Sequence, residues 1–362
     1  MNRSAKTSRN HSVVTLHAFE EGLKLRFTGL ARIAGIAGAV ALFSGCASNS
    51  LHFARAPGPG LNTPLFSEGE YLGRPSPQEL QRNQEDRTTT WMEPIDEKAR
   101  LTYVSDCGSN DVTVYDSNAR VVGEIGGLDC PLGLFVDRHG DLWVANSGEQ
   151  DVLEFARSGT TPIKTLTNAR AIPNDVTICP DDTLYVSNFG TDIEDGDIAV
   201  YPPGKTKPTR TLKSLGVNSN NWVTCDSSGN VFSMVIFGSQ LTEVGVIEYP
   251  LGRRAHQQTL PLYYIAYPGG IKADPSGDLL ISDGTGVTEY TEAGAPTGKS
   301  VLTPPYFQDV AVTKDGLLLG GTGRHIARSW AFPGGGERHN YRNVNPPSTS
   351  VPTGFAFDPG YP

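Results

Sequence analysis

Four oxygen-bearing side chains stand at comparable places in the sequence and together suit a metal ion or a polar ligand. They are Asn174, Asp175, Asn221 and Asp309, each close to the start of a short apolar run. Ca²⁺ takes roughly six to eight oxygen ligands from carboxylates, carbonyls and amides. Because only some of the related segments carry such residues, they differ from residues with a recurring structural role. Ca²⁺ or another divalent cation is therefore the cofactor to test at these positions.

Few other residues suit catalysis. His325, beside Arg324 in TGRHIARSW, is the candidate general base, and the alternative is an ordinary histidine on a surface loop. The sequence contains no GxSxG, HExxH, phosphate-loop or CxxC motif. This lack of a complete catalytic set favours a binding protein over an enzyme.

The apolar runs belong to a phrase that returns six times after residue 100, with its clearest copy at Pro131–Phe155. Each copy has an apolar run, an Asp, a nearby Gly, a second run ending in Asn or Asp, and a third run. A period of roughly 45 residues with several strands is typical of propeller blades. The Asp of the phrase falls at Asp137, Cys179, Asp226, Asp274, Thr313 and Asp358.

The runs are short and rich in Val, Ile, Leu, Tyr and Phe, which favours strands, and the intervening Asp and Gly favour tight turns. A fourth run closes each unit, so the sequence predicts four antiparallel strands per unit. The first unit, from Leu101, lacks its first strand, and a matching segment, TGFAFDPG, ends the chain at Thr353–Gly360. We therefore predict an all-β, six-bladed β-propeller of four-stranded antiparallel blades. The C-terminal strand would pair into blade one and close the ring.

This architecture predicts where the candidate residues lie. The loop before the first strand and the loop after the second strand share one rim of such a propeller. We expect Asn174, Asp175, Asn221 and Asp309 to ring one opening of the central channel, with His325 on the same rim. The recurring residues after the second strand are interpreted mainly as turn caps. These are Asp106, Asn146, Asn188 and Asp283.

The first 95 residues differ in character from the repeats. Six Lys or Arg and two Glu precede or flank the apolar stretch Ile33–Phe43, which is followed by Ser44, Gly45 and Cys46. This pattern resembles a bacterial lipoprotein signal, which implies lipidation of Cys46; an ordinary signal peptide cut nearby is the alternative. We predict a signal peptide at 1–45, a flexible tether at 46–95 and the propeller at 96–362. The protein would be lipid-anchored in the bacterial envelope, on the periplasmic side of the outer membrane.

Charge and cysteines limit the partners and the compartment. Removal of residues 1–45, with their net charge of +4, would change the net charge of the chain from −9 to −13. Such an acidic protein has no basic field for nucleic acid. Export permits disulfides, and blade geometry favours Cys107 with Cys130 and Cys179 with Cys225. For the second pair, two buried free thiols are an equal alternative.

The segments LWVANSGEQDVLEF (142–155) and LYVSNFG resemble the NHL repeat of six-bladed propellers, a likeness that covers about 260 residues and implies the fold rather than the function. Pro173-Asn174-Asp175 is similar to the Pro-Asn-Gly of the senescence-marker/gluconolactonase family, whose members hold a divalent metal with a Glu, two Asn and an Asp. Asp175 replaces that Gly, and no counterpart of the Glu or of the later Asp is found. Streptogramin lyases use a His and a Glu, and no matching pair is found.

Two hypotheses follow. The first is a membrane-anchored binding or scaffold module that presents one rim of its channel to a protein, a glycan or a small molecule. The second is a metal-dependent, lactonase-like hydrolase or lyase with its site at the central channel.

Overall fold

The computed structural model describes most of the chain from residue 90 onward. The described ranges are 90–167, 171–189, 196–214, 216–237, 243–253, 257–262, 265, 269–282, 286–302, 309–321, 327–341, 350 and 352–358. Contacts divide the chain into Met1–Thr63 and Pro64–Pro362, and every described residue belongs to the second unit.

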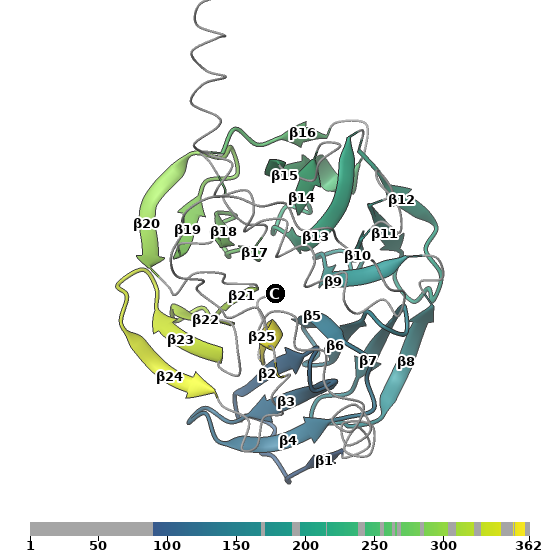
Figure 1. Ribbon diagram of the computed structural model, residues 1–362, viewed down its shortest axis with the longest axis vertical. Helices are drawn as coiled ribbons and strands as arrows, with labels where there is room; N and C mark the ends of the chain where they lie inside the picture. Colours follow the sequence, from purple (N-terminus) through teal and green to yellow (C-terminus); the bar gives the residue numbers. More distant parts are fainter. Residues whose placement is uncertain are drawn as a thin grey trace, which may run out of the picture. The chain divides into compact units, whose positions relative to one another are not determined.

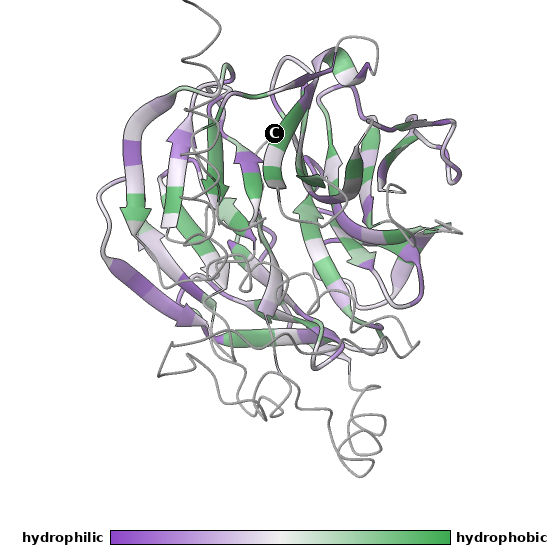
Figure 2. Cartoon of the chain, turned by 45° about the horizontal axis from the view of Figure 1, so that its top comes forward, coloured by the Kyte–Doolittle hydropathy of each residue, from purple (hydrophilic) through white to green (hydrophobic). Residues whose placement is uncertain are grey.

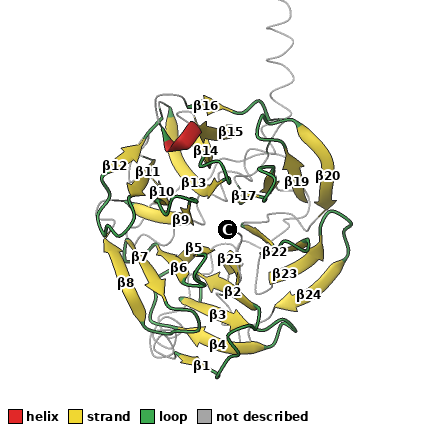
Figure 3. Cartoon of the chain, turned by 180° about the vertical axis from the view of Figure 1, so that it is seen from behind, coloured by secondary structure: helices red, strands yellow, loops and turns green. Residues whose placement is uncertain are grey.

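The described residues are almost entirely strand, with one 3-10 turn at Pro250–Gly252 (Figure 3). No described helix is long and apolar enough to cross a membrane. All strand pairs are antiparallel. The strands are β1 (Trp91–Met92), β2 (Leu101–Asp106), β3 (Asp111–Tyr115), β4 (Val121–Ile125), β5 (Pro131–Val136), β6 (Leu142–Asn146), β7 (Asp151–Phe155), β8 (Pro162–Thr167), β9 (Ile172–Ile178), β10 (Leu184–Phe189), β11 (Asp197–Tyr201), β12 (Arg210–Leu212), β13 (Val217–Cys225), β14 (Val231–Phe237), β15 (Glu243–Tyr249), β16 (Gln258–Thr259), β17 (Ile271–Ala273), β18 (Leu279–Ser282), β19 (Gly286–Tyr290), β20 (Pro296–Leu302), β21 (Val310–Val312), β22 (Leu317–Gly321), β23 (Ala327–Ala331), β24 (Glu337–Tyr341) and β25 (Pro352–Asp358).

The sheets of the second unit are arranged around a common centre, as in a propeller (Figure 1). Three sheets have the consecutive order β5-β6-β7-β8, β17-β18-β19-β20 and β21-β22-β23-β24. The innermost strands, β5, β9, β13, β17, β21 and β25, contact one another in a closed cycle. We call these six strands the inner strands. The all-β propeller arrangement predicted from the sequence is therefore present.

The C-terminal strand completes the sheet that begins the domain. The order of this sheet is β1-β4-β3-β2-β25, and β25 runs antiparallel to β2 with Leu101 opposite Asp358. All seven residues of β25 are buried. The predicted pairing of the two chain ends is confirmed.

One sheet is larger than the repeat predicted. The strands β9–β12 and β13–β16 belong to a single eight-stranded sheet, although among the described residues the two halves are joined only by the pair Phe189–Ser219. The cause is the length of β13, whose nine residues begin before the apolar run and reach the end of β10.

The core lies between neighbouring sheets. The first sheet contributes to it with both faces: one packs against the β5–β8 sheet and the other against the β21–β24 sheet. Hydrophobic residues accordingly recur along the strands (Figure 2). The predicted Asp turns are also confirmed: the Oδ1 atom of Asp137 accepts hydrogen bonds from the backbone N–H of His139 and of Asp141, at 2.8 and 3.0 Å. Asp226 and Asp274 make the same pair of bonds in their own turns.

A short fifth strand, β1, extends the first sheet outward, in the stretch where the sequence predicted only a tether. Trp91 and Met92 pair with Glu124 and Gly123 of β4. A Cβ atom at Gly123 would lie 2.4 Å from the sulfur of Met92, so the absence of a side chain at this position admits β1.

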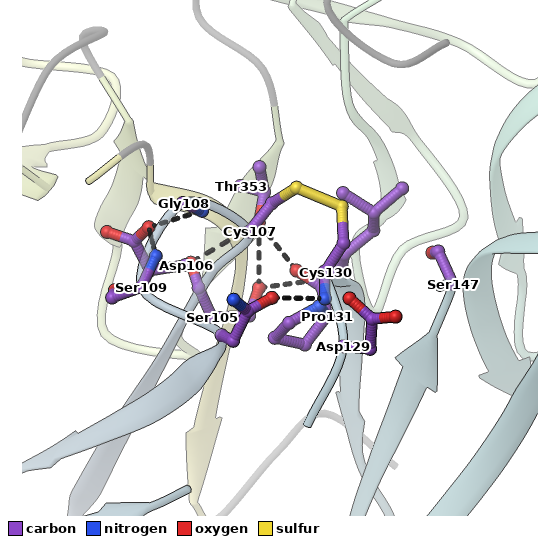
Figure 4. Close-up of a disulfide and its surroundings, with 12 residues drawn as sticks. Ser105, Asp106, Cys107, Gly108, Ser109, Asp129, Cys130, Pro131, Ser147 and Thr353 are labelled. Atoms are coloured by element: carbon purple, nitrogen blue, oxygen red, sulfur yellow. Dashed lines mark hydrogen bonds between the residues drawn. A yellow bond between two sulfur atoms is a disulfide. The ribbon is translucent and has the colours of Figure 1, made fainter. Parts of the chain in front are cut away.

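Two disulfides join neighbouring parts of the ring, and none of the described cysteines is free. Cys107, between β2 and β3, bonds to Cys130 at the start of β5 (Figure 4). Cys179 and Cys225, at the ends of the inner strands β9 and β13, form the second bridge. The structure thus pairs the cysteines as blade geometry favoured.

Replacement of either bridge by serines should lower the free energy of unfolding. The bridges close loops of 23 and 46 residues. Loop-closure entropy then gives losses of about 3 kcal/mol for Cys107–Cys130 and about 4 kcal/mol for Cys179–Cys225. Urea unfolding of the two double-serine variants measures both losses, and equal stability of a variant and the wild type would contradict the bridge it lacks.

Candidate functional site

The four residues singled out in the sequence lie on or beside the inner strands. Asn174 and Asp175 are in β9, Asn221 is in β13, and Asp309 directly precedes β21. The sequence predicted them at a rim, around an opening. The structure instead buries all four completely, each with 0% exposure. The prediction misplaced the residues because β9 and β13 begin earlier than the apolar runs suggest.

Asn174 and Asn221 are directly linked. The Nδ2 group of Asn174 donates to the backbone carbonyl of Asn221, and the same carbonyl accepts from Ser187 Oγ at 2.7 Å. The Oδ1 atom of Asn221 accepts from Ser219 Oγ at 2.9 Å. The other polar atom of each amide, Asn174 Oδ1 and Asn221 Nδ2, has no hydrogen-bond partner among the described residues.

Asp175 connects its own inner strand to the next one. Its Oδ2 atom accepts from the backbone N–H of Val223 in β13 at 3.0 Å. Its Oδ1 atom lies against Gly133 of β5, where a Cβ atom would approach to 2.1 Å. Residue 133 must therefore lack a side chain for Asp175 to occupy this position.

Asp309 makes a corresponding connection on another part of the ring. Its Oδ2 atom accepts from the backbone N–H of Phe355 in β25 at 3.1 Å, and its Oδ1 atom accepts from Val310 N at 2.7 Å. A Cβ atom at Gly270 would lie 2.7 Å from that Oδ1 atom. Both aspartates thus bind the backbone of a neighbouring inner strand.

Lys272 is the residue that sequence reasoning missed. It lies in the inner strand β17, and its Nζ atom is 3.9 Å from Asp175 Oδ2. Its side chain is 14% exposed, and Nζ has no hydrogen-bond partner among the described residues. The available signal was a single cation in the apolar run GGIKADPSG, where the aligned repeats have Phe135, Thr177, Thr224, Ala311 and Ala356.

Burial and charge act in opposite directions on the two aspartates. Burial raises the pKa of Asp175 and of Asp309, and the Lys272 ammonium lowers both. The charge of Asp175 raises the pKa of Asp309 further. A charged pair of Asp175 and Lys272 beside a protonated Asp309 therefore minimises the net buried charge.

The donor set does not fit Ca²⁺ or another divalent cation. Both Asp309 oxygens and one Asp175 oxygen already accept backbone hydrogen bonds, and Lys272 supplies the positive charge near the carboxylates. A hard cation needs several free oxygens around one point. The geometry here suits a structural ionic cluster with unpaired polar atoms at its edge.

Two other acidic groups were not anticipated and are already engaged. In Asp137–Asp141–Glu154 and in Asp274–Asp278–Glu289 the carboxylates lie within 4.8 Å of one another. Glu154 pairs with Lys164, and Glu289 accepts from Lys299 and Thr297. They are equivalent turns of two repeats.

The remaining predicted residues are only partly accounted for. Asp106 accepts from the backbone N–H of Gly108 and Ser109, as expected of a turn cap. Asn146 and Asn188 instead donate across their hairpins, to Asp151 and Asp197. His325, Asp283 and Cys46, the predicted site of lipidation, lie outside the described residues.

Two hollows adjoin the inner strands. A cavity of about 80 Å³ at the centre is bounded by residues of all six inner strands, Lys272 among them. A larger groove of about 520 Å³ lies between the β5–β8 sheet and the strands β9–β11, beside the Asp137 turn. The ion pair Arg138–Asp182 joins turns that belong to its two walls.

Comparison with solved structures supports the fold. A chain of the nidogen/laminin complex shares a TM-score of 0.59 at 12% identity, over 71% of this chain and 98% of that chain. Lower scores, 0.47 and 0.49, are found for Kuenenia stuttgartiensis hydrazine synthase (16% identity, 63% of this chain and 72% of that one) and for a protein assigned as a gluconolactonase (18% identity, 65% and 86%). The sequence matches no protein-family model and no curated protein. At 12% identity the first likeness concerns the propeller fold alone.

Proposed function

We propose that the domain is a six-bladed propeller of the NHL-repeat type. The closed cycle of six inner strands supports this count. The single pair Phe189–Ser219 that joins the eight-stranded sheet supports its division into two blades of four strands, β9–β12 and β13–β16. The repeat phrase in the sequence supplies the same division.

The protein would be held in the bacterial envelope by lipid on Cys46, with the residues between Cys46 and β1 as its tether. The basic and apolar N-terminal residues support export. The two disulfides agree with an oxidising compartment.

Within this setting the propeller binds a small polar ligand at the inner strands. The observation that carries this proposal is a gathering of buried polar atoms without partners. Ten buried side-chain N or O atoms of the described residues have no hydrogen-bond partner, and five of them belong to β9, β13 and β17. These five are Asn174 Oδ1, Asp175 Oδ1, Asn220 Nδ2, Asn221 Nδ2 and Lys272 Nζ.

Such atoms are normally satisfied, because each unmade hydrogen bond costs about 1–3 kcal/mol. Three of the five are donors and two are acceptors. The matching ligand carries a carbonyl or carboxylate oxygen together with a hydroxyl or amine, as in hydroxy acids, sugar acids and amino acids. Lys272 favours an acid among these. The metal-dependent hydrolase is the weaker hypothesis, since Lys272 and the backbone engage three of the four oxygens of Asp175 and Asp309.

A thermal-shift experiment on the full-length protein tests this function. Hydroxy acids, sugar acids and amino acids are added separately, and Ca²⁺ and EDTA form a further arm. A ligand at a hundred times its dissociation constant adds about 2.7 kcal/mol of stability. We expect such a shift from one class of acid and none from Ca²⁺ or EDTA.

Variants locate the effect. Asn174→Ala and Asn221→Ala should abolish the ligand-induced shift, while the exposed turn residue Asn118, changed to Ala, should leave it intact. Stabilisation by Ca²⁺ that disappears in Asn174→Ala would contradict the proposal and support the hydrolase.

A further inference from the structure

Three neighbouring hairpins of the ring carry the same cross-strand pair at their closed end. In each hairpin the last or second-last residue of the first strand faces the first residue of the second strand. The pairs are Asp106 with Asp111 in β2–β3, Asn146 with Asp151 in β6–β7, and Asn188 with Asp197 in β10–β11.

In two of the hairpins the pair is an amide and a carboxylate joined by a hydrogen bond. Asn146 Nδ2 donates to Asp151 Oδ1 at 2.8 Å, and Asn188 Nδ2 donates to Asp197 Oδ1 at 2.7 Å. The N–H of the amide offsets part of the carboxylate charge at a partly buried position. In these two hairpins the pair thus combines one carboxylate with one hydrogen-bond donor.

The β2–β3 hairpin departs from this rule, because both of its residues are acids. Asp106 and Asp111 are only 6% and 5% exposed. Residues directly opposite on antiparallel strands have Cβ atoms about 4.5–5.5 Å apart, so the two carboxyl groups are close neighbours. The pair therefore lacks the side-chain amide of the other two hairpins, and a proton on one carboxyl group would supply a donor between the two side chains.

The remaining contacts supply more hydrogen-bond donors to Asp106 than to Asp111. Its Oδ1 atom accepts from Gly108 N at 2.9 Å and Ser109 N at 3.0 Å (Figure 4), and its Oδ2 atom accepts from Ser350 Oγ. Asp111 Oδ1 accepts from Thr113 Oγ1 at 3.3 Å. The proton therefore belongs on Asp111.

The groups that act on Asp111 favour the same assignment. From β2 it faces Asp106, and from β4 it is influenced by Glu124, both of them acidic. Tyr115, on the same strand as Asp111, interacts with both aspartates and with Tyr341 of β24. The neighbouring cysteines, Cys107 and Cys130, are bridged and carry no charge.

Asp106 also faces the strand that closes the ring. It is opposite Pro352 in β25, and Ser350, which donates to it, lies two residues before Pro352. Asp106 thus belongs to the carboxyl pair and also contacts the start of β25.

We propose that Asp106 and Asp111 form a pH-sensitive latch on ring closure. In the closed latch a proton held between the two carboxyl groups replaces the amide hydrogen of the other hairpins. Opening of the β25 start and of the hairpin end exposes both acids to water and releases that proton, so rising pH favours the open end.

The direction follows from the pKa of Asp111. Burial, with help from Asp106 and Glu124, raises the pKa of Asp111 from 3.8 to about 8. The protonated Asp111 side chain contributes its full stabilisation at a pH below its ordinary pKa of 3.8. This stabilisation is lost as the pH rises through its raised pKa of about 8. Within that window, linkage increases the population of the open state by at most about tenfold per pH unit.

The decisive experiment is hydrogen exchange of the β25 and β2 peptides in the full-length protein, corrected for the intrinsic exchange rate at each pH. Between pH 5 and pH 7 we expect the wild type to lose protection at the start of β25 by roughly tenfold or more. Asp106→Asn restores the amide–carboxylate pair of the other hairpins and should remove most of this loss.

Two further variants test whether the pH dependence of exchange comes from Asp111. Asp111→Asn deletes the titrating group and should flatten the pH dependence even if Asp106→Asn does not fold. The matched control is Asp151→Asn in β7, which should keep the wild-type pH dependence in β25. Wild-type pH dependence in the Asp106→Asn or the Asp111→Asn variant would overturn the latch, and it would leave the ligand site at β9, β13 and β17 unaffected.

Discussion

A chain that ends at residue 349 is expected to lose the folded monomer. The deletion removes β25, whose backbone pairs with β2 and whose Phe355 and Phe357 are 0% and 3% exposed. Burial of each phenylalanine contributes about 1.5–3 kcal/mol. The total stability of a domain is about 5–15 kcal/mol, so this loss with its hydrogen bonds exhausts much of it.

The truncated chain would also expose β2 as a free edge, which invites pairing with other molecules. Circular dichroism and light scattering after gel filtration should show unfolded or oligomeric protein. A chain ending at Asp358 is the control and should remain a monomer. Addition of a peptide spanning residues 350–362 should restore folding to the short chain. A stable monomer without β25 would refute the closure of the ring by this strand.

Replacement of Lys272 by Met is expected to be the most damaging single change in the ring. Lys272 is the nearby cation for Asp175, at 3.9 Å, and it also acts on Asp309. Removal of one partner from a buried ion pair costs about 3–5 kcal/mol, because the other charge remains buried. Urea unfolding of Lys272→Met at pH 7 measures this loss.

The pH dependence provides a second measurement. Without the ammonium the pKa of Asp175 and of Asp309 rises further, since burial is then opposed by less positive charge. A group with a raised pKa loses its stabilising contribution as the pH rises. The free energy of unfolding of the variant should therefore fall more steeply between pH 5 and pH 8 than that of the wild type.

Two controls separate this effect from a general loss of packing. The double variant Lys272→Met/Asp175→Asn should recover much of the stability, because the uncompensated carboxylate is gone. Lys205→Met, at an exposed turn, should change little. Equal stability of Lys272→Met and wild type would show that the aspartates do not depend on Lys272.

Much of the fold could be predicted because the repeat carries it. The Asp137, Asp226 and Asp274 turns recur in a repeat of roughly regular length, and the incomplete first unit matched the C-terminal segment, so the pairing of β2 with β25 followed. The cysteine positions at strand ends favoured both bridges, although free thiols remained an equal alternative for Cys179 and Cys225. Features of this kind are local or periodic, and periodicity is visible in one sequence.

The candidate site was predicted less well, because its determinants are neither local nor periodic. Asn174 and Asp175 were singled out as irregular residues of the repeat, but the start of β9 was placed too late and their burial was missed. Lys272 has no counterpart in the other repeats, and its role depends on Asp175, almost a hundred residues earlier in the chain. Only the closed ring brings them together.

The outermost strand, β1, has a mechanical consequence. It is held to β4 by two residue pairs, by a hydrogen bond from Glu93 N to Val122 O, and by the exposed ion pair of Glu93 with Arg120. A pulling force that enters the domain through residues before Trp91 reaches these few bonds first. We therefore expect β1 to detach from β4 at a lower force than the force that unfolds the disulfide-linked ring.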